Sequence, residues 1–330
     1  MTQAIYQPLT LPNGTTLPNR LAKAAMEENM AISGHLPGES IFKLYQTWAK
    51  GGAGLLITGN VMVDHRAMTG PGGIALERDT PLEPFKKWAN TVKASNAHIW
   101  MQINHPGRQV YAAMGGKVLS PSDIALDLGK HSKLFGQPQP MTEEDIQELI
   151  QRFVTTATRA VEAGFDGIQI HAAHGYLLSQ FLSPLTNKRK DQWGGSLENR
   201  ARLLYDVVSA IKAAVPKETV IAVKLNSADF MKGGFTEDES MQVVKTLADE
   251  GIDLIEISGG SYEKLAFIDG VSAEKTVQKE STIKREAYFL DYAEKVRKLT
   301  DVPLVVTGGF RSAPAMEEAV QNNATDFIGL

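Results

Sequence analysis

Eight short apolar segments alternate with longer segments of helical periodicity, and this alternation restricts the fold more than any other feature of the chain. Most of the short segments are continuous runs of Val, Ile and Leu, which is the pattern of strands buried on both faces of a parallel sheet. The predicted strands are Leu21–Met26, Gly54–Gly59, His98–Asn104, Gly167–His171, Val220–Asn226, Leu254–Ser258, Leu304–Thr307 and Asp326–Leu330. The predicted helices are Ser40–Lys50, Leu82–Ser95, Glu143–Ala163, Leu197–Ala214, Thr236–Glu250 and Glu286–Leu299.

Eight strands at fairly regular spacing favour a closed (β/α)8 TIM barrel over an open, doubly wound sheet. No Gly-x-Gly-x-x-Gly motif follows the first strand, which weighs against a dinucleotide-binding sheet. We therefore predict that residues 1–330 form a single barrel domain. The sequence stops at Leu330, the end of the predicted eighth strand, so the eighth helix of the barrel is expected to be lacking in this chain.

Two segments outside the alternation have predicted places in such a barrel. The segment Thr10–Pro18 has Asn13-Gly14 at its centre and is expected to form a hairpin that seals the bottom of the barrel. The segment Tyr111–Pro140 is long and rich in Gly and Pro. It is expected to be an excursion after the third strand, over the mouth of the barrel.

Composition excludes several classes of function. The chain has no cysteine, which rules out disulfides, iron–sulfur clusters, thiolate zinc sites and a cysteine nucleophile. Its formal net charge is -4, and no basic stripe indicates binding to nucleic acid or to a membrane surface. The first residues do not resemble a signal peptide, and no apolar run reaches membrane-spanning length. We predict a cytoplasmic protein that binds a small molecule, either as a monomer or as a homo-oligomer.

Polar residues at the carboxyl ends of the strands are the candidates for chemistry, because this end carries the active site in barrel enzymes. The third strand ends with Gln102, followed by His105 and Arg108. The fourth ends in the stretch His171, His174 and Tyr176, the fifth contains Lys224, and Gly-Gly turns follow the sixth and seventh.

The two histidines have three interpretations. They are core histidines with satisfied hydrogen bonds, or zinc ligands completed by His65 and Asp229, or a pair of donors that polarises a carbonyl oxygen. No His-x-His follows the first strand, so no metal is expected. In the third interpretation Tyr176 is a nearby proton donor.

Lys224 and the glycine turns also leave alternatives open. Lys224 forms a salt bridge inside the barrel, or a Schiff base as in barrel aldolases, or a contact with the anionic part of a cofactor. The turn Gly308-Gly309, after the seventh strand, lies where barrels commonly bind a phosphate.

Taken together, these stretches resemble the old yellow enzyme family of flavin-dependent oxidoreductases. The most specific stretch is HAAHGYLLSQFLSPLTNKRKDQWGGSLENRARLL, residues 171–204, and LPNRLAKAAM, MQINHPGRQ and VPLVVTGGF support it. The resemblance runs from about Leu9 to Leu330. It implies non-covalent FMN at the mouth of a (β/α)8 barrel, reduced directly by NADH or NADPH.

The resemblance also implies roles for individual residues. Those that would contact FMN are Ala24, Ala25, Met26, Gly59, Gln102, Lys224, Gly308 and Gly309. His171 and His174 would hold the oxygen of an α,β-unsaturated carbonyl or nitro compound, and Tyr176 would protonate the α-carbon. The same histidines would bind nicotinamide, which gives ping-pong kinetics.

The chain departs from the family pattern at three places. Lys224 stands where many members have Arg, Glu27 stands where relatives often have Thr or Cys, and the usual Gly-Arg after the eighth strand lies beyond Leu330. The role of Glu27 stays open. Two other functions remain as alternatives to an ene-reductase, namely a Schiff-base aldolase or lyase that uses Lys224 and a non-catalytic flavin or phosphate binder.

Overall fold

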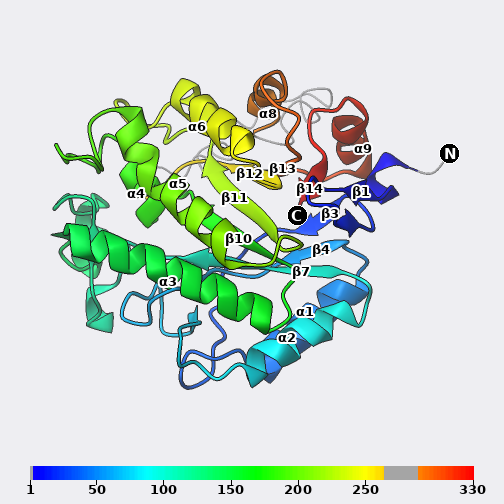
Figure 1. Ribbon diagram of the computed structural model, residues 1–330, viewed down its shortest axis with the longest axis horizontal. Coiled ribbons are helices and arrows are strands. Elements are labelled where there is room, and N and C mark those ends of the chain that lie inside the picture. The colour runs from blue at the N-terminus through cyan, green and yellow to red at the C-terminus, as the bar shows by residue number, and fades with distance from the viewer. Residues whose placement is uncertain (1–2, 264–288) are drawn as a thin grey trace.

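Eight parallel strands close into a barrel in a computed structural model that describes residues 3–263 and 289–330. The barrel strands are β3 (Leu21–Lys23), β4 (Leu55–Ile57), β7 (His98–Asn104), β10 (Gly167–Ala172), β11 (Val220–Asn226), β12 (Leu254–Ser258), β13 (Leu304–Thr307) and β14 (Phe327–Gly329). Hydrogen bonds join β10 to β7 and β14 to β3, so no strand of the ring is left at an edge. The predicted (β/α)8 barrel is confirmed (Figure 1).

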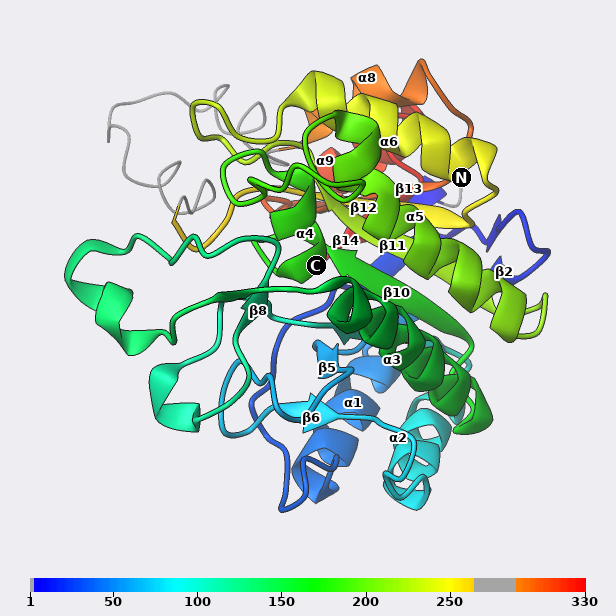
Figure 2. The same ribbon diagram turned by 60° about the vertical axis from the view of Figure 1, so that its left-hand side comes forward.

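The helices pack around the outside of the barrel, as Figures 1 and 2 show. They are α1 (Glu39–Lys50), α2 (Glu83–Lys93), α3 (Glu143–Glu162), α4 (Leu177–Leu182), α5 (Leu197–Ala214), α6 (Glu237–Asp249), α8 (Leu290–Arg297) and α9 (Ala313–Gln321). Capping boxes begin two of them, where the side chains of Thr142 and Thr236 each accept a hydrogen bond from the third helical amide. These local signals explain why the starts of α3 and α6 were predictable.

Three helices differ from the prediction. Helix α4 was not predicted and has only six residues. Helix α9 was not predicted, because it has only nine residues and its buried apolar face consists of Ala319 alone. For the predicted helix Glu286–Leu299, the structure gives Leu290–Arg297, and its first three predicted residues lie outside the described residues. The first strand is also shorter than predicted and ends at Lys23.

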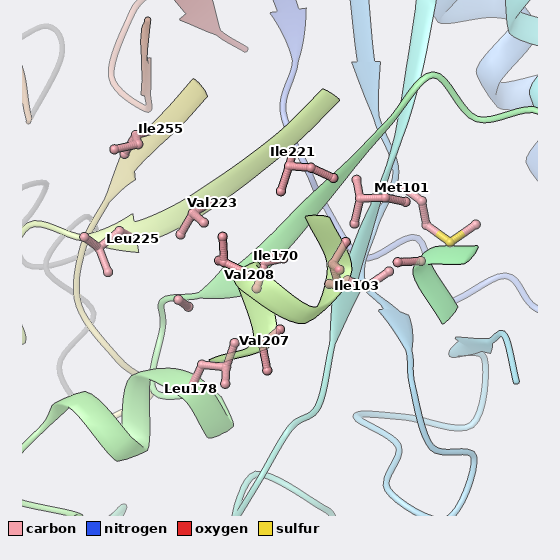
Figure 3. Packing of buried hydrophobic residues seen from close by; sticks show 14 of the residues in the cluster. Met101, Ile103, Ile170, Leu178, Val207, Val208, Ile221, Val223, Leu225 and Ile255 are labelled. Carbon is pink, nitrogen blue, oxygen red and sulfur yellow. The ribbon is translucent and has the colours of Figure 1, made fainter. Parts of the chain in front are cut away.

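The main hydrophobic core lies between the strands and the helices. Figure 3 shows Ile170 of β10 and Ile221 and Val223 of β11 among side chains of α5, with Met101 and Ile103 of β7 nearby. All of these side chains are buried. Alternate apolar residues of these strands therefore serve the outer face of the barrel, and residues between them, such as Gln169, point into it.

A smaller apolar cluster closes the amino end of the barrel. The hairpin of β1 (Leu9–Thr10) and β2 (Thr16–Leu17) places Leu11 and Leu17 against Trp100 and Phe327. The turn between its strands uses Gly14 at φ 89°, a conformation that glycine adopts at little cost. The predicted hairpin and its place at the bottom of the barrel are confirmed.

The segment Tyr111–Pro140 leaves the barrel after β7 and returns at α3, as predicted. It contains two short 3-10 helices (Ala112–Met114 and Gly129–Leu134) and a pair of two-residue strands, β8 (Leu119–Ser120) and β9 (Gln139–Pro140). Phe135 stacks on Tyr111 and makes an edge contact with the ring of Tyr262, which follows β12. The segment thereby reaches the carboxyl end of the barrel.

Candidate active site at the carboxyl end of the barrel

The structure brings His171, His174 and Tyr176 together where β10 ends. The ring centroid of His171 lies 5.0 Å from that of His174 and 4.9 Å from that of Tyr176, and both pairs are edge to face. A turn makes this possible, in which His174 and Gly175 both have positive φ (59° and 73°). The crowding that the sequence indicated is therefore real in three dimensions.

Both histidines are neutral over the physiological range. Burial is the largest cause that lowers the pKa of His171 well below its usual value, and it lowers that of His174 to about 3. The cation of Lys224 lowers both pKa values further. A neutral imidazole has one N–H to donate, and hydrogen bonds decide which nitrogen carries it.

The hydrogen bonds of the two rings differ. Nδ1 of His171 accepts a bond of 3.2 Å from the amide of Ala173, so its Nε2 carries the proton and is the donor. Nε2 of His174 lies 2.6 Å from Oγ of Ser258, and its amide donates to Asn226. His171 thus has a donor available for a ligand, while the ring of His174 is tied to β12.

Tyr176 is buried, and its hydroxyl lies 3.0 Å from the hydroxyl of Tyr262. Burial, followed by the neighbouring Tyr262, raises the pKa of Tyr176 well above its usual value. The phenol is therefore protonated, which is the state that a proton donor needs. Tyr262 was not among the predicted site residues; the only signal in the sequence was its place three residues after Gly259, beyond the end of β12.

A chain of polar side chains crosses the barrel interior beneath this cluster. Nε2 of Gln102 donates to Oε1 of Gln169 at 2.7 Å, and Nε2 of Gln169 donates to Oε2 of Glu256 at 2.6 Å. The other carboxylate oxygen of Glu256 lies 2.9 Å from Nζ of Lys224. Strand register brings them together, since Gln169 is level with Gln102 and Lys224 is level with Glu256.

The ion pair bears on the three interpretations of Lys224. Its side chain is 3 % exposed and bound to a carboxylate, which is the arrangement of a buried ion pair rather than of a free amine nucleophile. The salt bridge is present and nothing in this geometry favours the Schiff base, while contact with the anionic part of a cofactor stays a prediction. Sequence reasoning missed Gln169 and Glu256, although each is a polar residue within an otherwise apolar strand.

A second buried lysine lies at the end of β3. Nζ of Lys23 is 3.3 Å from the carboxylate of Glu28 and donates to the carbonyl oxygen of Ile57 at 3.0 Å. Tyr45 donates to the same carboxylate at 2.5 Å. Gly59 follows β4 and lies against the segment that follows β3. A side chain at Gly59 would collide with Glu28 and with the carbonyl oxygen of Met26, so glycine is required for this close packing.

The segment after β3 carries the other residues predicted at the mouth. Ala24 is buried and bonded through its amide to the carbonyl oxygen of Leu330, Ala25 is half-buried, and the side chain of Met26 is 57 % exposed. Glu27 accepts a hydrogen bond of 2.6 Å from Thr69, and burial raises the pKa of its carboxyl. Its charge also contributes to the raised pKa of Tyr176.

The turn Gly308-Gly309, which follows β13, has a backbone conformation that requires glycine. Gly308 and Gly309 are half-buried and have φ of 103° and 91°, values that residues other than glycine rarely adopt. Helix α9 begins four residues later, at Ala313. The turn therefore has backbone geometry that glycine adopts at little cost, at the carboxyl end of β13.

The residues weighed as further zinc ligands lie in other settings. His65 bonds Glu77 at 2.5 Å, and the ligand atoms of Asp64, His65 and Glu77 lie within 4.8 Å of one another. Guanidinium groups already neutralise these acids, because Arg66 pairs with Asp64 and Arg152 pairs with Glu77. Asp229 instead accepts hydrogen bonds from Ser183 and from the amide of Phe235.

His105 and Arg108 were also candidates for chemistry. Both make contacts with the loops around the mouth of the barrel. Arg108 is buried, bonds the carbonyl oxygens of Ile124 and Ala125, and pairs with Glu263. His105 is buried, and its Nδ1 accepts a bond of 3.0 Å from the amide of Gly107. Burial lowers the pKa of His105 to about 4.

The low pKa of His105 predicts a specific dependence of stability on pH. Between its ordinary value of 6.5 and the folded value of about 4, the unfolded chain binds a proton that the folded chain does not. The free energy of unfolding should therefore fall on acidification, by about 1.4 kcal/mol per pH unit from this histidine. In urea titrations at pH 7 and pH 5, His105→Gln should lose less stability than the wild type. An equal loss would contradict the assignment.

Comparison with known proteins identifies the family. The family described as "NADH:flavin oxidoreductase / NADH oxidase family" matches residues 4–330. The chain is 38% identical to the NADH-dependent flavin oxidoreductase iliE of Hypocrea jecorina, over 98% of this chain and 84% of that protein.

Within the described residues, no helix is long and apolar enough to cross a membrane.

Solved structures agree with this assignment. A 2-naphthoyl-CoA reductase superposes with a TM-score of 0.88 at 26% identity, over 100% of this chain and 50% of that one. The old yellow enzyme homologue from Zymomonas mobilis superposes with a TM-score of 0.82 at 26% identity, over 99% of this chain and 88% of that one. The chain belongs to the NADH:flavin oxidoreductase / NADH oxidase family, and it is an FMN-dependent oxidoreductase of the old yellow enzyme type.

Proposed function

We propose that this enzyme reduces activated C=C bonds, in α,β-unsaturated carbonyl or nitro compounds, with electrons from NADH or NADPH. One observation carries the proposal. The donor of His171 and the phenol of Tyr176 meet at the carboxyl end of the barrel, with ring centroids 4.9 Å apart. An oxygen-polarising donor beside a proton donor is the pair of functions that this reaction requires.

The residues at the mouth fit FMN. Met26 exposes an apolar side chain there, which suits the face of an aromatic ring. Below it, Gln102 offers amide atoms for the polar edge of the ring, and Lys224 offers a positive charge. Gly308 and Gly309 have no side chains to keep a phosphate from their backbone, and they follow β13, where barrels commonly bind a phosphate. We assign FMN contacts to these residues and to Ala24, Ala25 and Gly59.

His171 and His174 bind the substrate oxygen in this proposal. His171 donates from Nε2, because its Nδ1 is already an acceptor. In His174, Ser258 engages Nε2, so Nδ1 is the nitrogen left for the substrate. Since the hydroxyl of Ser258 can donate to Nε2, Nδ1 keeps the ring proton and serves as the second donor. Hydrogen bonds to the oxygen withdraw electron density from the conjugated alkene.

Tyr176 delivers the proton to the α-carbon. FMN, when bound, supplies the hydride that reaches the β-carbon of the same alkene. Tyr262 is positioned to hold the hydroxyl of Tyr176 in place, at 3.0 Å. The two histidines also bind the nicotinamide carboxamide when the coenzyme occupies the same space, so the coenzyme and the alkene bind in turn, as ping-pong kinetics requires.

The test follows the colour of the protein. The purified enzyme, reconstituted with FMN, should be yellow, should bleach anaerobically with NADH or NADPH, and should regain its colour on addition of 2-cyclohexenone with formation of cyclohexanone. A matched sample given cyclohexanone, which lacks the alkene, should stay bleached. If the bleached enzyme regains its colour only with oxygen and with no alkene from a panel of enones and nitroalkenes, the proposed substrate class is wrong.

A further inference from the structure

Glu256 lies buried beneath the mouth of the barrel, and the reaction described above does not use it. Its Oε1 pairs with Lys224 at 2.9 Å and accepts from Thr307 at 2.7 Å. Its Oε2 accepts from Gln169 at 2.6 Å. The side chain is 0% exposed, so a full set of donors compensates for removing the carboxylate from water.

The carboxylate dictates the orientation of two amides. An ionised carboxylate can only accept hydrogen bonds, so Gln169 must turn its nitrogen toward Glu256 and its oxygen toward Gln102. Gln102 must then turn its nitrogen toward Gln169, at 2.7 Å. The oxygen of Gln102 is left to face other partners. Glu256 thereby decides, through one intermediate, which atoms Gln102 presents to a ligand.

The same carboxylate offsets the charge of Lys224. A cation near the polar edge of a flavin stabilises the electron-rich reduced form, and an anion 2.9 Å from that cation opposes the effect. The other buried lysine, Lys23, is matched in the same way by Glu28 at 3.3 Å. The barrel interior therefore presents paired charges to the mouth rather than two isolated cations.

We propose that Glu256 is a positioning residue with two roles: it sets the reduction potential of bound FMN by offsetting the charge of Lys224, and it supports FMN binding by fixing the amides of Gln169 and Gln102. The inference rests on the FMN placement assigned under the proposed function, and it adds a residue that never touches the flavin. It concerns how readily the enzyme gives up electrons rather than which alkene it reduces.

The test is the midpoint potential of the FMN-loaded Glu256→Gln enzyme, measured anaerobically against a reference dye. This change removes the negative charge and keeps the size of the side chain. We expect the preference for reduced over oxidised FMN to rise about tenfold or more, which is an upward shift of about 30 mV for a two-electron couple. The new amide also donates to Gln169, which reverses both amides and should weaken the binding of oxidised and reduced FMN alike.

Two control variants separate charge from orientation. Asp253→Asn removes one charge at the opposite end of β12, where Asp253 bonds the amide of Ile221 at 2.8 Å. Its preference for reduced FMN should stay within about threefold of the wild type, because the charge is distant from the mouth. Gln169→Met breaks the amide chain without a change in charge. It should weaken both redox states of FMN alike and leave the potential within the same limit.

A folded, FMN-loaded Glu256→Gln enzyme with the wild-type potential would overturn the inference. If that variant does not fold, Lys224→Met combined with Glu256→Gln removes both charges and leaves no unpaired ion. The potential of this double variant should match that of the wild type. A fall of about tenfold in the preference for reduced over oxidised FMN would show that Lys224 acts as a lone cation, and it would equally overturn the inference. If the potentials shift as expected but no alkene is reduced, only the proposed function fails.

Discussion

Tyr176→Phe is expected to slow alkene reduction about 10²- to 10⁴-fold, which is the usual contribution of a positioned general acid. The change removes the hydroxyl and keeps the ring that packs edge to face on His171, with centroids 4.9 Å apart. Reduction of the flavin by NADH needs no proton from this phenol, so its rate should stay within about twofold of the wild type. Stopped-flow measurement of the two half-reactions gives both rates directly.

Tyr262→Phe is the matched control for this prediction. It removes the neighbouring hydroxyl, 3.0 Å away, and leaves the phenol of Tyr176 in place. We expect a smaller loss, about tenfold or less, because the donor itself remains and only its orientation is relaxed. If Tyr176→Phe slowed flavin reduction and spared alkene reduction, the proton-donor assignment would be wrong.

His171→Ala is expected to lower the rate of alkene reduction about 10²- to 10³-fold, the cost of removing one donor to a developing negative charge on oxygen. It should also weaken binding of phenols, which place an oxygen where the substrate oxygen is proposed to lie. Titration of the oxidised enzyme with 4-hydroxybenzaldehyde, followed by the change in flavin absorbance, measures this binding without turnover.

Two further variants test whether the loss comes from the donor. His171→Asn restores an N–H at this position and should recover part of the phenol affinity. His131→Ala changes an exposed histidine in the segment after β7 and should leave binding and turnover unchanged. Equal effects of His171→Ala and His171→Asn on phenol binding would argue that the imidazole acts through packing, and the hydrogen-bond role would then be rejected.

Much of the barrel was predictable from the sequence because its signals are local. Continuous apolar runs such as Val220–Asn226 mark buried strands, and that strand has the predicted bounds in the structure. Capping residues such as Thr142 mark the start of a helix without reference to the rest of the chain. Helix α9 was missed for the same reason, since its short, weakly apolar sequence carries little local signal.

Part of the candidate site was also predictable from residues that are close together in the sequence. His171, His174 and Tyr176 lie within six residues, so any turn after β10 keeps them close, and the sequence alone determined that imidazoles and a phenol would meet there. Gln102 and Lys224 were identifiable as polar residues in apolar strands. What each would contact depended on strands distant in the sequence.

Only the tertiary structure decided those contacts. Closure of the barrel sets the register that places Lys224 level with Glu256 and Gln169 level with Gln102, across separations that no sequence pattern encodes. It also brings Tyr262 to the hydroxyl of Tyr176, 86 residues away along the chain. The physical reason is that a buried polar group without a partner costs free energy, and only the closed barrel determines which partners are within reach.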